Sequence, residues 1–249
     1  MLFRSAQKGK TCRMCNQHLH LKPLAAVFLL FAALFPTSPA MARSATCERE
    51  GATLQLLSAL SCLSVRPDYT GAYNRSAQFG SSWTDDDHDG LDTRAEVLIN
   101  ESTTTVVMNA SGVTVRSGRW YSLYDNKVVS IAIQLDVDHM VPLAEVWRSG
   151  AASWTLARRK SYANDLGVGW TLRAVSLGEN RSKGDDDPSL WMPPYRGSWC
   201  TYLVEWVDVK IRWGLSMNSA ERSAIRNNWM SAGCSNRAKP PKVRVRLAP

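Results

Sequence analysis

The sequence lacks an apolar run long enough to cross a bilayer. A transmembrane helix needs about 20 apolar residues, and the run at residues 24–35 has only twelve. Basic residues without any acid precede this run, and Ala40-Met41-Ala42 follows it with the small-residue pattern of a signal peptidase site. We therefore predict a signal peptide at residues 1–42, cleavage after Ala42, secretion, and no membrane association of the remaining chain.

Histidine and cysteine are both scarce. Two of the four histidines lie within the predicted signal peptide, so only two are left to act as bases or ligands. Four of the six cysteines lie beyond it, and an even number in an oxidising compartment indicates two disulfides. Of the three pairings we favour Cys47 with Cys62 and Cys200 with Cys234, because each closes a local loop.

Strong positive charge is also absent outside the leader. The net charge of the whole chain is +8, but five basic residues lie at positions 1–42, so the rest carries about +3. Overall basicity is therefore weak evidence for nucleic-acid binding. The remaining excess concentrates in residues 237–249, which we predict to be a flexible basic tail that contacts phosphates or stays solvated.

The chain contains no repeat of 20–50 residues, which excludes solenoids and propellers. No pattern in it indicates an oligomeric state. Apolar spacing predicts helices at 51–63, 93–102, around 154–164 and through the C-terminal third. Runs rich in Val, Ile and Thr predict strands at 103–108, 113–116, 128–135 and 171–176. We expect one α+β domain over residues 43–236, which is long enough to bury a sizeable core.

The C-terminal third shows two local helix signals. Trp199, Tyr202, Trp206 and Trp213 recur at near-helical spacing, which favours a buried stripe over a binding site. The pair formed by the asparagine at 218 and the glutamate at 221 has the spacing of a capping box at the start of a last helix.

The stretch "LDVDHMVPLAE", residues 135–145, concentrates polar groups at the end of an apolar run. Asp136 and Asp138 alternate along a strand, and two carboxylates on one face suit a hard cation such as Mg²⁺ or Mn²⁺. Solvent-exposed acids at a strand end are the alternative. His139 can act as a general base if its imidazole is neutral. On a regular strand Asp138 and His139 point to opposite faces, so a shared site requires the strand to end or twist there.

Several motifs in order extend this pattern. "LDVDHMVPL", "YANDL", "LRAVS" and "NRSKGDDDP" together resemble the HNH, or His-Me finger, nuclease motif. The longer series, from "WTDDDHDGLDTRAEVL" through "GRWYS" to "WCTYLVEWVDVKIRW", resembles secreted HNH-family proteins related to the C-terminal domain of GmrSD-type restriction nucleases. The similarity covers roughly residues 70–234. It implies a ββα-metal core with additional packed helices, and a secreted metal-dependent endonuclease acting on nucleic acid, DNA rather than RNA.

The resemblance also implies a role for individual residues. His139 would activate water, Asp138 and Asn180 would hold one Mg²⁺ or Mn²⁺ ion, and Asn164 would steady the site. Asn164 and Asn180 occupy motif positions at which the family carries His or Asn. Asp136 would orient the metal ligands without contacting the ion itself.

Two cations are further candidates for contact with substrate. Lys183 could reach a phosphate oxygen, or it could be an ordinary solvated lysine. Arg94 could grip a phosphate through its rigid guanidinium. The alternative for Arg94 is a salt bridge to Asp92 or Glu96 within one helical turn.

The acidic segment "DDDHDGLDTRAE" also matches an EF-hand loop. The matching residues, at loop positions 1, 3, 5, 6 and 12, are Asp85, Asp87, Asp89, Gly90 and Glu96. Against a calcium site, Asp92 occupies a position that is normally apolar, and the preceding residues are a poor helix. The corresponding alternative function is a calcium-stabilised secreted binding protein that keeps a nuclease scaffold without turnover. A nonspecific or RNA-directed nuclease is a third possibility.

Overall fold

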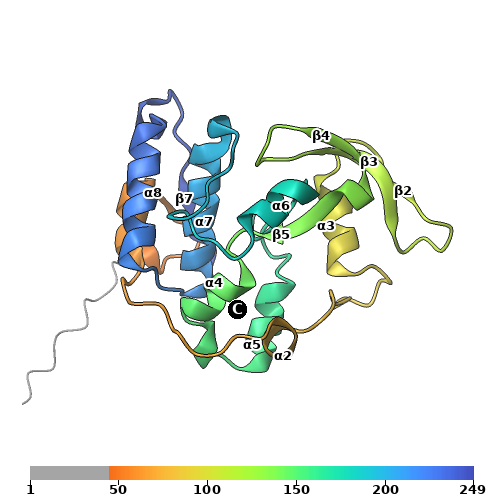
Figure 1. Cartoon of the computed structure of the whole chain (residues 1–249), viewed down its shortest axis with the longest axis horizontal. Helices are drawn as coiled ribbons and strands as arrows, with labels where there is room; N and C mark the ends of the chain where they lie inside the picture. The colour runs from red at the N-terminus through yellow and green to blue at the C-terminus, as the bar shows by residue number, and fades with distance from the viewer. Residues whose placement is uncertain (1–44) are drawn as a thin grey trace, which may run out of the picture. The chain divides into compact units, whose positions relative to one another are not determined.

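A computed structural model describes residues 45–249 (Figure 1). The predicted signal peptide, residues 1–42, lies outside the described residues. Within residues 45–249, none of the helices combines the length and the apolar character that a membrane span requires.

Helices make up most of the regular structure. The α-helices are α1 (Leu56–Ala59), α2 (Arg75–Phe79), α3 (Thr93–Glu101), α4 (Leu143–Arg148), α5 (Leu156–Ala163), α6 (Leu177–Lys183), α7 (Trp199–Trp213) and α8 (Ser219–Ser231). Short 3-10 turns occur at Ala45–Cys47, Leu60–Cys62, Ala132–Gln134, Ala151–Ser153, Arg196–Ser198 and Cys234–Asn236.

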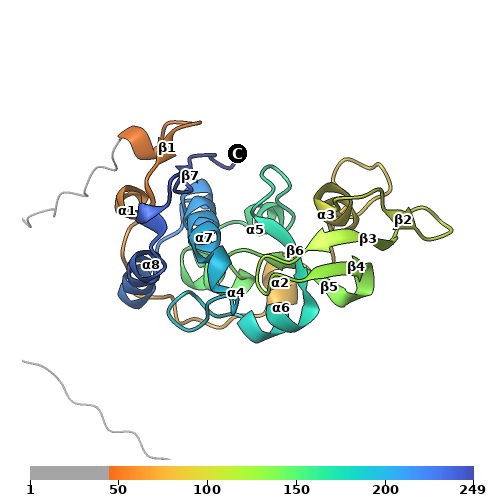
Figure 2. The ribbon, with the colours of Figure 1, turned by 90° about the horizontal axis from the view of Figure 1, so that it is seen from above.

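The strands pair in small antiparallel sheets. Strand β1 (Thr53–Leu54) pairs with β7 (Val243–Arg244), and β5 (Leu135–His139) pairs with β6 (Leu172–Ser176). Strands β2 (Val107–Met108), β3 (Val115–Tyr121) and β4 (Val128–Ile131) form a third sheet in that order, and α3 lies beside it (Figure 2). This mixture of helix and sheet confirms the predicted α+β class.

The β5–β6 pair separates an apolar face from a polar one. Its register is continuous along the whole of β5. Leu135 and Val137 pack into a small hydrophobic cluster together with residues of α3 and β3. Because side chains alternate along a strand, Asp136 and Asp138 occupy the other face, and α6 contacts them there.

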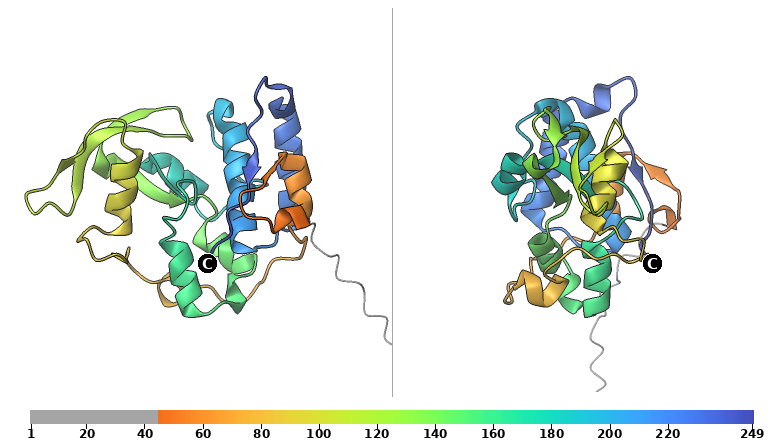
Figure 3. Two further views of the ribbon diagram at one scale, coloured as in Figure 1. Left: turned by 180° about the vertical axis from the view of Figure 1, so that it is seen from behind. Right: turned by 90° about the vertical axis from the view of Figure 1, so that its right-hand side faces the viewer.

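Helix α7 carries the main hydrophobic core. The predicted aromatic stripe lies on this helix, where Tyr202, Trp206 and Trp213 are buried and Trp199 is half-buried. Helix α8 runs beside α7 (Figures 1 and 3). The stripe is therefore a packing feature, as the spacing predicted.

The start of α8 follows the predicted cap in part. The Oδ1 atom of Asn218 accepts a hydrogen bond from the backbone N–H of Glu221 at 2.9 Å. The Glu221 carboxylate does not return to the cap but accepts from Trp206 at 2.6 Å and Lys210 at 2.7 Å, inside the core. Tertiary pairing thus replaced the second half of the capping box.

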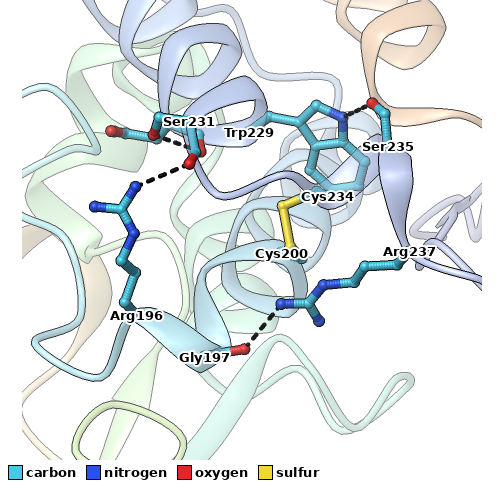
Figure 4. Close-up of a disulfide and its surroundings, with 9 residues drawn as sticks. Arg196, Gly197, Cys200, Trp229, Ser231, Cys234, Ser235 and Arg237 are labelled. Carbon is cyan, nitrogen blue, oxygen red and sulfur yellow. Dashed lines mark hydrogen bonds between the residues drawn. A yellow bond between two sulfur atoms is a disulfide. The ribbon is translucent and has the colours of Figure 1, made fainter.

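Both predicted disulfides, Cys47–Cys62 and Cys200–Cys234, are present. Figure 4 shows the second of them joining the first turn of α7 to the turn that follows α8. The bonded cysteines are separated by 15 and 34 residues. By restricting the unfolded chain, loops of this size stabilise the fold by roughly 3 to 4 kcal/mol each.

The C-terminal segment is not the flexible tail that its charge predicted. Val243 and Val245 are fully buried, and β7 is paired with β1. Arg212 of α7 donates to the carbonyls of Arg246 at 3.0 Å and Leu247 at 3.2 Å. The prediction was wrong because it considered charge and overlooked the alternation of valine with arginine, which places the valines in the core.

The strand predicted at residues 128–135 is two strands in different sheets. Strand β4 ends at Ile131, a 3-10 turn follows, and β5 begins at Leu135. Arg94 of α3 holds this break by donating to the carbonyls of Ala132 at 3.1 Å and Leu135 at 2.9 Å. The other boundaries also shifted. The strand predicted at 103–108 is only the two residues of β2, and the range 51–63, predicted as one helix, contains β1, α1 and a 3-10 turn.

Asp208 of α7 generates a prediction about stability and pH. Its carboxyl is buried and accepts from the backbone N–H of Arg244 at 2.5 Å. Burial raises the pKa of Asp208 to about 8. Because the pKa of Asp208 is higher in the folded state than in the unfolded state, its contribution to stability is fully present below pH 4. As the pH rises toward 8, this contribution is lost by up to about 1.4 kcal/mol per pH unit.

Asp208→Asn keeps the acceptor oxygen and cannot ionise. Urea unfolding at pH 4 to 8 should therefore show a shallower loss of stability in this variant than in the wild type. Glu48→Gln, which replaces an exposed carboxylate, is the control. Identical pH profiles for the wild type and Asp208→Asn would contradict the assignment.

Candidate active site

Strand β5 ends at a hollow of about 250 Å³. Its walls include Asp138 and His139 from β5 and Asn180 from α6, with further residues from α2 and from the start of α4. We call this space the β5 hollow. It brings together three of the residues singled out in the sequence, from segments more than 40 positions apart.

The Asp138 carboxylate is buried and held by two donors. Its Oδ2 atom accepts from the Tyr124 hydroxyl at 2.5 Å and from the Lys183 ammonium at 2.6 Å. Lys183 also donates to the carbonyl of His139 at 2.8 Å. The other oxygen, Oδ1, forms no hydrogen bond with residues 45–249, so it is the atom of Asp138 that is available to a ligand.

Burial and pairing act in opposite directions on these groups. Burial raises the pKa of Asp138 and lowers the pKa of Lys183, while the attraction between the two opposes both shifts. Burial, and after it the charge of Asp138, raises the pKa of Tyr124 well above its usual value, so the phenol stays protonated and donates. Two donors on one oxygen favour the carboxylate form of Asp138.

The His139 imidazole is buried on the other side of the strand end. Its Nε2 atom lies 2.9 Å from the carbonyl oxygen of Ala163, to which it donates. The rings of Trp83 and Tyr162 stack with it at centroid distances of 5.3 and 6.0 Å. With the proton on Nε2, the lone pair lies on Nδ1. Burial lowers the pKa of His139 to about 3, so the ring is neutral at neutral pH.

Asp138 and His139 therefore point to different elements. Asp138 contacts α6, whereas His139 contacts the end of α5, as successive residues of a strand must. Both line the β5 hollow because β5 ends at His139. The strand thus ends where the sequence analysis required an end or a twist for the two side chains to share one space.

Asn164 does not contact His139 directly through a hydrogen bond, but it bonds to the segments that carry two of the neighbours of His139. It ends α5, its Oδ1 atom accepts from the backbone N–H of Thr84 at 3.0 Å, and its amide donates to a carbonyl one turn earlier. These bonds join the segment that carries Trp83 to the helix end that carries Ala163, and both of those residues contact His139. This geometry suits the steadying role that the resemblance implies.

Asn180, in the middle of α6, contacts Asp136 of β5. The Asn180 amide donates to the Asp136 carboxylate at 3.1 Å. Asn180 and Lys183 are three residues apart and so share one face of α6. Asp136 and Asp138 are two residues apart and share one face of β5. Asn180 of the helix therefore pairs with Asp136 of the strand, and Lys183 pairs with Asp138.

Lys183 does not have the role expected of it at the surface. The residue is 1% exposed, and its ammonium is engaged by Asp138 and the carbonyl of His139. The expected contact with a substrate phosphate is wrong for this geometry. The physical reason is that Asp138 is buried and needs a positive partner.

Arg94 also lies elsewhere. It lines a separate hollow of about 630 Å³ beside β3 and β4, and its guanidinium bonds to the carbonyls of Ala132 and Leu135. It forms neither the phosphate grip at the β5 hollow nor the salt bridge to Asp92 or Glu96. The expected salt bridge was wrong, because the break between β4 and β5 recruits the guanidinium of Arg94, and this residue lies outside the β5 hollow.

The acidic loop brings three carboxylates together. Asp85, Asp87 and Asp89 can each offer an oxygen, and these oxygens lie within 4.8 Å of one another. Burial and then the charges of this loop raise the pKa of Glu96. No helix leads into the loop from residues 80–84. The calcium site is therefore still a prediction, because exposed acidic groups often gather without an ion.

Four residues at the site were not found from the sequence. Tyr124 and Trp83 hold Asp138 and His139, and the exposed guanidinium groups of Arg75 and Arg181 line the β5 hollow. Arg181 follows Asn180 in the chain, and that adjacency is a usable signal. The other three are distant in sequence, and no local pattern indicates them.

A protein named as secreted is similar to about half of this chain. No family model and no solved structure matches the chain. A protein of Arthroderma benhamiae named "Uncharacterized secreted protein" is 44% identical over 133 residues, which are 53% of this chain and 64% of the relative. The match thus spans less than two thirds of that relative. Its name and the two disulfides fit an extracellular location.

The buried pair of Asp138 and Lys183 generates a prediction. Lys183→Met leaves a carboxylate buried without its cation, so it should destabilise the fold by about 3 to 5 kcal/mol. Arg181→Met on the same helix alters an exposed side chain and should change stability by no more than about 0.5 kcal/mol. Denaturant unfolding measures both.

A second variant separates charge from packing. Adding Asp138→Asn to Lys183→Met removes the uncompensated charge, so the double variant should recover part of the lost stability. A loss in Lys183→Met as small as in Arg181→Met would show that the pair is not buried as described.

Proposed function

We propose that the protein is a secreted, metal-dependent endonuclease of the HNH, or His-Me finger, type. It hydrolyses phosphodiester bonds in nucleic acid, with DNA as the main substrate. The observation that carries this proposal is the β5 hollow, whose walls include Asp138, His139 and Asn180. The antiparallel pair β5–β6 followed by α6 supplies these residues, as expected for a ββα-metal core.

His139 is the general base in this proposal. The hydrogen bond from Nε2 to Ala163 sets the tautomer and leaves Nδ1 to take a proton from water. Burial keeps the ring neutral, which is the form a base requires, although a pKa of about 3 makes it a weak base by itself. A bound phosphate carries negative charge, which favours the imidazolium and so strengthens the base during the reaction.

The donor set fits a hard divalent cation. The free Oδ1 of Asp138 and the amide oxygen of Asn180 would hold it, with the Asp136 carboxylate beside them. Such oxygen ligands suit Mg²⁺ or Mn²⁺. When bound, the ion supplies Lewis-acid polarisation of the phosphate and stabilises charge on the leaving 3′ oxygen. Lys183 already offsets the charge of Asp138, so we expect the substrate phosphate to add to metal affinity.

Plasmid digestion with Mg²⁺ or Mn²⁺ tests the proposal. His139→Ala should lower the cleavage rate by about 10² to 10⁴, the usual contribution of a general base, and EDTA should abolish cleavage. Arg226→Ala, an exposed change on α8, is the control and should cut normally. Equal cleavage by the wild type and His139→Ala would refute the assignment, and a parallel assay on RNA decides between the two nucleic acids.

The acidic loop supports a second candidate function, a calcium-stabilised binding protein without turnover. Its basis is the approach of the Asp85, Asp87 and Asp89 oxygens to within 4.8 Å. For this function, calorimetry should show calcium binding that Asp85→Ala abolishes and Asp138→Ala leaves intact, with no cleavage of any nucleic acid. Absence of calcium binding at millimolar concentration would eliminate it.

A further inference from the structure

Two further hollows lie around α2, and the smaller of them adjoins the β5 hollow. A small one of about 60 Å³ shares Arg75 and His139 with it. A third, of about 300 Å³, shares Ser81 and Ser82 with the small one and reaches Lys160 on α5. We call the three together the α2 groove. It leads from α6, past the end of β5, to α5.

Three exposed cations lie along the α2 groove. Arg181 lines the β5 hollow, Arg75 lines both the β5 hollow and the small one, and Lys160 lines the third. None of their side chains forms a salt bridge or a hydrogen bond with residues 45–249. Neighbouring cations are engaged instead: Lys183 pairs with Asp138, and Arg159 donates to backbone carbonyls.

The rest of the lining also suits an anion. No carboxylate lines the second or third hollow among the described residues. Ser81 and Ser82 offer exposed hydroxyl groups there, and the buried hydroxyl of Thr84 has no hydrogen-bond partner within residues 45–249. Asp185 lies only in the β5 hollow, at the end where Asp138 lies. The second and third hollows are therefore more favourable to phosphates than the β5 hollow, which contains the carboxylates of Asp138 and Asp185.

We propose that Arg181, Arg75 and Lys160 form a track for the sugar-phosphate backbone of a nucleic acid strand that crosses His139. The proposal rests on the proposed function and adds the path of the substrate. Contacts of cations and hydroxyls with phosphates position a strand without reading its bases. Sequence-independent binding is therefore expected, together with a preference for strands several nucleotides long over dinucleotides.

Binding can be measured apart from cleavage. Fluorescence anisotropy of a labelled single-stranded DNA 20-mer, in EDTA, gives the affinity of the disulfide-bonded protein from 50 to 200 mM salt. For single strands, each phosphate contact contributes about 0.7 to the slope of log K against log salt. The triple variant Arg75→Ala/Lys160→Ala/Arg181→Ala should therefore lose about 2 units of slope.

The matched control is Arg222→Ala/Arg226→Ala/Lys242→Ala, which removes the same charge from exposed positions outside the groove. It should retain the wild-type slope. Thermal unfolding midpoints of both triple variants should equal the wild-type value, because all six side chains are exposed.

The outcomes separate this track from the nuclease proposal. A wild-type slope in the groove variant, or equal losses in both triple variants, overturns the track, while cleavage lost in His139→Ala would still support the nuclease. Binding that depends on the track, in a protein that cuts no nucleic acid with Mg²⁺ or Mn²⁺, overturns the nuclease and supports the track.

Discussion

The buried carboxylate of Asp138 needs a positive partner, and the arrangement of the site follows from that need. A buried charge without compensation costs several kcal/mol. Lys183 compensates it at 2.6 Å from the last turn of α6, so this helix must lie across the polar face of β5. Asn180, three residues earlier on the same face of α6, then lies against Asp136, two residues earlier on the same face of β5, and donates to it at 3.1 Å. One ion pair thus orients both candidate ligands.

Other buried ion pairs hold the frame around the site. Lys210 of α7 contacts Glu145 of α4 at 2.8 Å and Glu221 of α8 at 2.7 Å, which ties the helix that follows β5 to the core. Arg173 of β6 pairs with Glu205 of α7. These contacts divide the cations into two groups. The buried lysines Lys183 and Lys210 are paired with carboxylates, and the exposed cations along the α2 groove are available to an anionic ligand.

The sequence identified three residues that line the β5 hollow, but not the partners that hold them. The adjacency of Asp138 and His139 and the later Asn180 was enough to indicate an acid, a base and an oxygen donor. Whether Lys183 or Arg94 was free could not be predicted, because that depends on partners more than 35 positions away. Nδ1 of His139 can be assigned the lone pair only because Nε2 is known to donate to Ala163. Oδ1 of Asp138 is known to be available only because Oδ2 is known to accept from Tyr124 and Lys183.

The sequence by itself determined the elements and bonds that depend on near neighbours. Helices α3, α5 and α7, strand β6 and both local disulfides follow from periodicity and short loops, since these act within a few turns of the chain. Tertiary structure alone decided which charges are buried. It also decided that Arg94 donates to the carbonyls at the break between β4 and β5, and that the C-terminal valines pack into the core. Burial depends on the whole core, and the free energy of a charge depends on burial, so distant segments assign the role of each ionisable side chain.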